Sequence, residues 1–340
     1  MRPFLFALSW LALIILAGCA APLTPTPFAP TPALALTPTP FPTIATTEVE
    51  FVWKLTDDTV QEPAAPYLDS QGNLYVLDLE KERVVKLNGD GEVLIAFGEH
   101  GAGEGQFNFR PVGTPLYHDS VWGGDLVVDQ QGNIYVADGG NFRVQVFDAQ
   151  GKYLRQWGKR GTAEGEFEVP WTIALDPNGF LYVGDFTGYI YKFDTNGIFL
   201  GKLGAGRGSG AGQFRVAVHD VEADLNGNIY ASDFKLPRVF KFDPTGKLIL
   251  QWNKCGADTL SPAGLGVDAS GNVYVIDYSA SRICKFDSQG NLLSAWGKPG
   301  NSEGEFRFGE SADVAIDLDG NVYVTSDDPP FIQKFRRTLK

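Results

Sequence analysis

The chain has 340 residues, a formal net charge of −13, 40 glycines and only three cysteines. An acidic surface repels phosphate backbones, which argues against a nucleic-acid partner. It also argues against adsorption to anionic lipid, so any membrane attachment has to come from a lipid anchor alone. A chain this long exceeds an ordinary single core unless it is built from repeats.

The first eighteen residues, 1–18, have the pattern of an export signal. Arg2 precedes an apolar run over residues 4–16, which is too short to span a bilayer as a permanent helix. The run ends in Leu-Ala-Gly-Cys19, which resembles the lipobox of bacterial lipoproteins. The resemblance implies cleavage before Cys19, lipidation of Cys19 and a place in a bacterial cell envelope, on the extracytoplasmic side of a membrane. The alternative is an ordinary signal peptide followed by a chance cysteine.

Residues 19–47 form a tract rich in proline and threonine. Eight prolines and no hydrophobic period occur in it, a composition that favours an extended chain and cannot build a core. Such a tract reaches up to roughly 90 Å when fully extended. We interpret it as a disordered tether, which leaves residues 48–340 as the folded domain.

From Tyr67 onward one pattern recurs six times. Its clearest copy covers residues 129–138, Asp-Gln-Gln-Gly-Asn-Ile-Tyr-Val-Ala-Asp, followed by Arg143-Val144 and Trp157-Gly158. The copies are spaced 60, 47, 48, 44 and 49 residues apart at Asn73, Asn133, Phe180, Asn228, Asn272 and Asn321. A period in the forties made of short strands and tight turns predicts propeller blades, because a single blade cannot bury both faces of its sheet.

Residues 170–204 show how one repeat divides into strands. Alternating runs rich in large or branched residues are separated by Asp-x-x-Gly turns, in which glycine accepts a positive φ. The predicted strands cover residues 171–175, 180–184, 189–193 and 198–203. We therefore expect a meander of four antiparallel strands in each blade.

The two ends of the repeat region complete each other. The sixth repeat lacks its last strand, whereas an orphan strand over residues 49–55 precedes the first repeat. Trp53 stands where the other repeats have Trp157, Trp252 and Trp296. We predict that residues 49–55 pair with 331–336 and close the ring, which removes exposed sheet edges. The long first spacing reflects an insertion near residues 108–121, expected on one face.

These repeats resemble the NHL family over about residues 49–340. The match is carried by Gly-Asn-x-Tyr-Val-x-Asp, Arg-Val or Arg-Ile, and Phe-Asp, as in residues 271–277, 282–283 and 286–287. The resemblance implies an all-β, six-bladed β-propeller. The family consists mostly of binding platforms with a few enzymes, and the fold does not choose between them.

Two further features of the repeats have structural explanations. An Asp ends the second strand in most repeats and an Arg follows five residues later in four of them, so we expect structural ion pairs. Gly-rich tails ending in Phe107, Phe167, Phe214 and Phe306 follow four blades. No helix follows these tails to bind a phosphate, so we expect connectors with Phe as a core plug.

Cys255 and Cys284 remain once Cys19 is used for the anchor. Neighbouring blades could bring them together, and an exported location permits a disulfide. We nevertheless expect two unpaired thiols, because the sequence does not provide the short Cα separation that a disulfide requires.

The first strand of a propeller blade lines the central channel, so one residue per blade forms a layer around the axis. Four residues before the Asp that ends each first strand lie Ala65, Asp125, Thr172, Asp220, Gly264 and Asp313. Three facing carboxylates require a cation, water or raised pKa values. Oxygen ligands suit Ca²⁺ or Mg²⁺ better than zinc, which makes Asp125, Asp220 and Asp313 candidate metal ligands. The favoured alternative is that each Asp accepts backbone N–H groups of a neighbouring blade.

Trp171 and His219 each lie one residue before this layer. We expect Asp125, Trp171, His219, Asp220 and Asp313 to form a binding mouth, roofed by the 108–121 insertion. The preferred function is a monomeric, lipid-anchored binding module for a protein, peptide or glycan ligand. The alternatives are a divalent-cation-dependent lyase or lactonase with His219 as acid or base, and a scaffold in an envelope complex. No catalytic residue is assigned.

Overall fold

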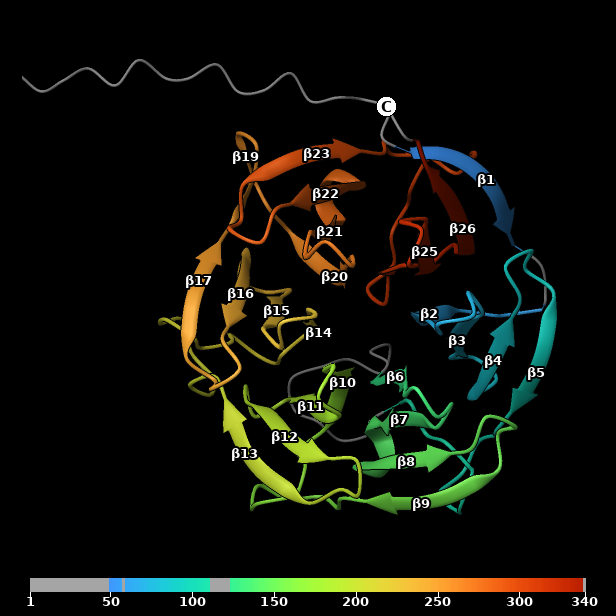
Figure 1. Cartoon of the computed structure of the whole chain (residues 1–340), viewed down its shortest axis with the longest axis vertical. Coiled ribbons are helices and arrows are strands. Elements are labelled where there is room, and N and C mark those ends of the chain that lie inside the picture. Colours follow the sequence, from blue (N-terminus) through green and yellow to red (C-terminus); the bar gives the residue numbers. More distant parts are fainter. Residues whose placement is uncertain (1–48, 57–58, 111–122, 339–340) are drawn as a thin grey trace, which may run out of the picture. The chain divides into compact units, whose positions relative to one another are not determined.

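The computed structural model describes residues 49–56, 59–110 and 123–338. The expected signal peptide, Cys19 and the tether lie outside these residues. The described part contains six four-stranded antiparallel sheets arranged around a central axis, as the sequence predicted (Figure 1). No helix among the residues described is long and apolar enough to cross a membrane.

Each blade is a meander whose first strand lies at the axis and whose last strand lies outside (Figure 1). Blades one to three comprise β2 (Pro63–Leu68), β3 (Leu74–Asp78), β4 (Arg83–Leu87) and β5 (Val93–Phe97); β6 (Gly124–Val128), β7 (Ile134–Asp138), β8 (Arg143–Phe147) and β9 (Tyr153–Trp157); and β10 (Pro170–Leu175), β11 (Phe180–Asp185), β12 (Ile190–Asp194) and β13 (Phe199–Leu203).

Blades four to six complete the ring. They comprise β14 (Asp220–Ala223), β15 (Ile229–Asp233), β16 (Arg238–Phe242) and β17 (Leu248–Trp252); β20 (Pro262–Val267), β21 (Val273–Asp277), β22 (Arg282–Phe286) and β23 (Leu292–Trp296); and β24 (Asp313–Ile316), β25 (Val322–Asp327), β26 (Pro330–Arg337) and β1 (Val49–Leu55). We call the side where the inner strands begin the connector face, and the side where they end the turn face.

The amino-terminal strand β1 closes the sixth blade. It pairs antiparallel with β26, and Phe51 lies opposite Phe335 while Trp53 lies opposite Lys334. The Phe51 and Phe335 rings meet edge to face at 6.1 Å. The predicted closure is therefore correct, and the ring presents no open edge at the junction of the first and last blades.

A repeated side-chain motif holds the first turn of each blade. In blade one, the Asp69 carboxylate accepts the N–H groups of Gln71 and Asn73 at 2.9 Å, and the Tyr75 hydroxyl also bonds to it at 3.3 Å. The Lys86 ammonium lies 4.8 Å from the centre of the Tyr75 ring. Because the carboxylates of these turns are already used, they are not free to bind a ligand.

The Gly-rich tails behave as predicted connectors. Phe107, Phe167, Phe214 and Phe306 are fully buried between blades. Phe107 packs so close to Gly98 that a Cβ on Gly98 would lie 2.3 Å from its ring. The glycines of these tails thus serve packing, not phosphate binding.

The predicted Asp–Arg pairs form within blades one, two and five. Arg83 contacts Asp78 at 2.9 Å, and equivalent pairs join Arg143 to Asp138 and Arg282 to Asp277. In blade four, Arg238 instead donates to the carbonyl groups of Ser209 and Gly210.

The expectation of two unpaired thiols was wrong, because Cys255 and Cys284 form a disulfide. The connector after blade four lacks the Gly-rich tail and folds as a small hairpin, β18 (Lys254–Cys255) and β19 (Asp258–Thr259). This hairpin brings Cys255 within 6.2 Å of Cys284, Cα to Cα. A disulfide closing a loop of this length stabilises the fold by about 3 to 4 kcal/mol.

Candidate functional site

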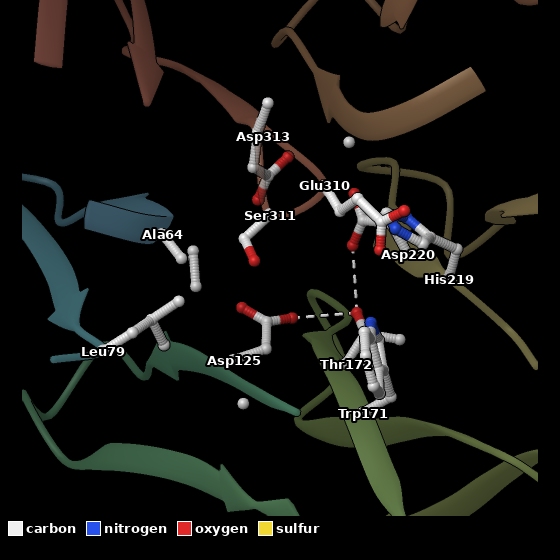
Figure 2. A pocket seen from close by; sticks show the side chains of 14 residues that line it. Ala64, Leu79, Asp125, Trp171, Thr172, His219, Asp220, Glu310, Ser311 and Asp313 are labelled. Carbon is white, nitrogen blue, oxygen red and sulfur yellow. Dashed lines mark hydrogen bonds between the residues drawn. The ribbon is translucent and has the colours of Figure 1, made fainter. Parts of the chain in front are cut away.

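The five residues of the predicted mouth lie together at the connector end of the channel (Figure 2). With Ala65, Thr172 and Gly264 they border a cavity of about 40 Å³. A cavity of this size holds an ion or a few waters but not an organic substrate. The roof expected from the insertion lies largely outside the described residues, as does His118.

Asp125, on β6, joins blade two to blade three. Its Oδ2 accepts the N–H of Ile173 and contacts the hydroxyl of Thr172, both at 2.8 Å. Its Oδ1 accepts the N–H of Leu126 at 2.7 Å. Both oxygens are therefore occupied, as the structural alternative for these aspartates requires.

Asp220, on β14, joins its blade to both neighbours. Its Oδ2 accepts the N–H of Leu265 in blade five at 2.6 Å. Its Oδ1 accepts the N–H of Val221 at 2.7 Å and lies 2.9 Å from the hydroxyl of Thr172 in blade three.

The Thr172 hydroxyl lies between Asp125 and Asp220 (Figure 2). It has one hydrogen and so donates to only one of the two carboxyl groups at a time. Its oxygen also accepts the N–H of Val221 at 3.1 Å, and its hydroxyl lowers the pKa of both carboxyl groups.

Asp313, on β24, differs from the other two. Its Oδ1 accepts the N–H of Val314 at 2.7 Å. The residue of blade one that corresponds to Ile173 and Leu265 is Pro66, which has no N–H. Asp313 therefore has no backbone N–H of the next blade to accept, and it interacts with the charges on Asp220 and Asp125.

Burial and neighbouring charges raise the pKa values of the three carboxyl groups of this layer. Burial, followed by the charge on Asp220, raises the pKa of Asp125 to about 7. Burial raises the pKa of Asp220 to about 6, and burial with the two neighbouring charges raises the pKa of Asp313 well above its usual range. Near neutral pH the three carboxyl groups therefore do not all carry a charge.

A row of partly exposed rings begins at the mouth with Trp171 and His219 and continues over blades four and five; we call it the aromatic arc. The His219 ring lies 6.2 Å from Trp171 and stacks on Phe234 at 5.1 Å, and Phe234 meets Tyr278 edge to face at 5.3 Å. Sequence reasoning missed Phe234 and Tyr278. Both directly follow the Asp that ends the second strand, so the repeat register contained the signal.

His219 is neutral at physiological pH. Burial lowers its pKa to about 4, and the backbone of Glu310 partly opposes this shift. Its Nδ1 is buried and has no hydrogen-bond partner in the described structure. The ring therefore presents a lone pair, which suits a hydrogen-bond acceptor or a base. His100, by contrast, is 76% exposed and contacts Glu82.

An acidic groove adjoins the mouth between blades six and one. Its volume is about 730 Å³, and Glu310 belongs both to it and to the mouth. Burial, followed by the charge on Glu80, raises the pKa of Glu62 in this groove. The acidic residues that line it are Glu62, Glu80, Glu310, Asp327 and Asp328.

Comparison with known sequences identifies the repeat. Residues 124–147, which cover β6 to β8, match the NHL repeat. NHL repeat-containing protein 3 is 33% identical in human and 35% in mouse over 121 residues, which is 34% of this chain and 30% of either relative. The protein brain tumor of Drosophila melanogaster is 30% identical over 158 residues, 45% of this chain and 13% of the relative. The matches thus span less than a third of each relative's length.

Solved structures share the fold at low sequence identity. A streptogramin B lyase superposes with a TM-score of 0.56 at 13% identity, over 85% of this chain and 97% of the lyase. A Bacteroides thetaiotaomicron protein of unknown function gives 0.60 at 16% identity, over 86% and 72%. Virginiamycin B lyase from Staphylococcus aureus gives 0.55 at 10% identity, over 85% and 100%. The protein is therefore an all-β, six-bladed propeller whose second blade carries an NHL repeat.

Proposed function

We propose that this protein is a membrane-anchored binding module outside the cytoplasm, whose connector face takes a protein, peptide or glycan ligand. The observation that carries the proposal is the meeting of two recognition features on one face. The aromatic arc runs from Trp171 and His219, which line the channel mouth, to Tyr278, which lines the acidic groove.

The arc offers rigid ring surface for a ligand. Trp171, His219, Phe234 and Tyr278 are each partly exposed. Trp171 and His219 line the mouth and Tyr278 lines the groove, and aromatic side chains commonly anchor partners. The groove has the size of a ligand site, and its carboxyl groups favour a basic ligand segment. A peptide segment with lysine or arginine fits this combination better than an acidic or a neutral one.

The binding face is tested with immobilised propeller incubated with native envelope extract. The wild type is compared with Tyr278→Ala on the connector face and Leu318→Ser on the turn face. The wild type and Leu318→Ser should retain the same partner, and Tyr278→Ala and salt at about 0.5 M should release it. Equal retention by all three proteins would count against the connector face.

Anchoring is tested separately. Replacing Cys19 with serine removes the atom that would carry the lipid, so the protein should move from the membrane fraction to the soluble extracytoplasmic fraction. Retention of Cys19→Ser in the membrane fraction would show that another segment attaches it.

The second candidate is a divalent-cation-dependent enzyme of the lyase or lactonase type. It is favoured by the convergence of Asp125, Asp220 and Asp313 with the unpartnered Nδ1 of His219. The three carboxyl groups would hold Ca²⁺ or Mg²⁺, which would supply Lewis acidity, and His219 would accept a proton. Against it, the oxygens of Asp125 and Asp220 already accept backbone N–H groups.

Thermal unfolding tests whether the candidate enzyme binds a divalent cation. Ca²⁺ or Mg²⁺ should raise the unfolding temperature relative to EDTA if the layer binds a cation. The same temperature in all three conditions would remove the metal-dependent enzyme from consideration.

A further inference from the structure

A second cavity opens at the opposite end of the channel, on the turn face. Its volume is about 480 Å³, and it lies among the ends of the inner strands and their turns; we call it the funnel. Tyr67, Leu175, Val267 and Ile316 contribute to its wall, and Glu222 lies among them. A cavity of this size accommodates a small organic molecule.

The repeats provide an internal control for Glu222. It lies two residues beyond Asp220 on β14, so its side chain belongs to the next layer of the channel. The same register position in the six blades holds Tyr67, Val127, Ala174, Glu222, Gly266 and Ala315. Five blades form without a carboxyl group at this position, so the fold does not require one.

Glu222 also lacks the partners that the connector-end aspartates have. Within the described residues it forms no ion pair with a basic side chain, and the N–H of Ala223 is the hydrogen bond that stabilises its charge. Burial, then the charges on Asp220 and Asp125, raise its pKa well above the usual range. The remaining titratable group of its layer is Tyr67, whose hydroxyl donates to the carbonyl of Val128 at 3.0 Å.

The Asp carboxylates in the turns around the funnel are not free to pair with a charged ligand, because they already accept hydrogen bonds. Asp176 and Asp224 accept the N–H groups of their own turns at 2.9 Å, and Asp268 does the same. Glu222 is therefore the carboxyl group of the funnel that is not already engaged by its turn.

The rim of the funnel is apolar over half its circumference. Leu225 is 67% exposed and Leu318 is 75% exposed, and both line the funnel. Pro177 and Ala269 occupy the same turn position in blades three and five, whereas blades one and two have Ser70 and Gln130. Because these apolar side chains line a cavity, they favour a ligand with a hydrocarbon portion.

We propose that the funnel binds a small aliphatic amine, with its ammonium group against Glu222 and its alkyl chain against Leu225 and Leu318. A cation supplies the partner that Glu222 lacks, and the apolar rim gains by burying hydrocarbon. Leu225 lies three residues after Glu222, in the turn that follows β14, so the chain between them spans at most about 10 Å, which suits an amine with about six carbons. This site is independent of the connector face and of its ligand.

The test is calorimetric titration of the whole chain with n-hexylamine and, as an uncharged control, n-hexanol. Hexylamine should bind at least about tenfold more tightly than hexanol, because only the ammonium pairs with the carboxylate. At pH values below the pKa of Glu222, binding should also release a proton, so the heat should vary with the ionisation enthalpy of the buffer. Below the pKa of Glu222, affinity for hexylamine should rise about tenfold per pH unit.

Three variants separate the contributions. Glu222→Gln keeps the shape and should reduce hexylamine binding to the level of hexanol, without proton release. Leu318→Ser should weaken both ligands, and Glu303→Gln, which removes an exposed carboxyl group elsewhere, should change neither. Thermal unfolding of each variant verifies that it is folded.

The proposal would be overturned if the wild type did not bind hexylamine or if it bound hexylamine and hexanol with equal affinity. It would also be overturned if Glu222→Gln bound hexylamine as tightly as the wild type does. The hexanol comparison and the proton release use the wild type alone, so they decide the matter even if Glu222→Gln does not fold.

Discussion

Buried carboxyl groups occur at both ends of the propeller channel, but their surroundings differ. At the connector end, Asp125 and Asp220 accept backbone N–H groups of the next blade and share the hydroxyl of Thr172. At the turn end, Glu222 accepts no backbone N–H group of a neighbouring blade among the described residues, and burial is the largest cause of its raised pKa. Acidity alone therefore does not mark a ligand site in a repeat ring. The carboxyl group without a structural partner is the informative one.

The largest difference should appear when each end loses one carboxyl group. Asp220→Ala leaves the N–H of Leu265 without its acceptor, and should cost about 3 kcal/mol of unfolding free energy. Glu222→Ala removes an unpaired buried acid, and should leave stability unchanged or raise it by about 1 kcal/mol. Urea unfolding of both variants measures the contrast. Similar losses in both would show that Glu222 also has a structural role.

The pH dependence of stability should sharpen the same contrast. Asp125 and Asp220 have pKa values raised to about 7 and about 6, so the folded state binds more protons than the unfolded state. Their contribution is fully present below about pH 4 and is lost as pH rises through about 7. Urea unfolding at pH 5 and pH 8 should show that Asp125→Asn loses less stability over this interval than the wild type. An identical loss in both proteins would argue that Asp125 titrates at an ordinary pKa.

A smaller effect is expected from the hydroxyl that links the two aspartates. Thr172→Val keeps the shape but removes the contacts with Asp125 and Asp220, and should cost about 1 to 2 kcal/mol. Ala174→Ser, two residues further along β10, serves as the control in the turn-end layer and should change stability less. Chemical unfolding compares the two, and an equal effect would mean that the threonine contacts contribute little.

The smallest effect should come from the rim of the funnel. Leu318→Ser alters a side chain that is 75% exposed, so stability should change by less than about 0.5 kcal/mol. Binding of a hydrophobic dye to the turn face should nevertheless fall. A large loss of stability would mean that Leu318 packs against other residues.

Much of the fold followed from the repeat pattern. The positions of the Gly-Asn turns and the orphan segment around Trp53 were sufficient to predict six blades and their closure, because strand periodicity and turn chemistry are local properties. Counting back from the turn Asp likewise identified Asp125, Asp220 and Asp313 as members of one channel layer.

The rest depends on contacts that a linear pattern does not contain. The Cys255–Cys284 disulfide depends on a hairpin that replaces the usual Gly-rich tail, and its geometry cannot be obtained from spacing. Phe234 and Tyr278 could have been found by extending the repeat alignment one residue beyond the second strand. Counting along the repeats in the same way also reaches Glu222. Only the structure shows that, within the described residues, Glu222 has no basic partner.

Carboxyl ¹³C NMR of the labelled protein, titrated with pH in the absence and presence of n-hexylamine, tests the contrast between the two channel ends most directly. The account predicts that free Glu222 titrates well above its ordinary value, that the amine moves its titration to lower pH, and that the amine changes the signals of Asp125 and Asp220 less than that of Glu222. A free Glu222 that titrates near its ordinary value of 4.5, or an amine response confined to the aspartates, would contradict it.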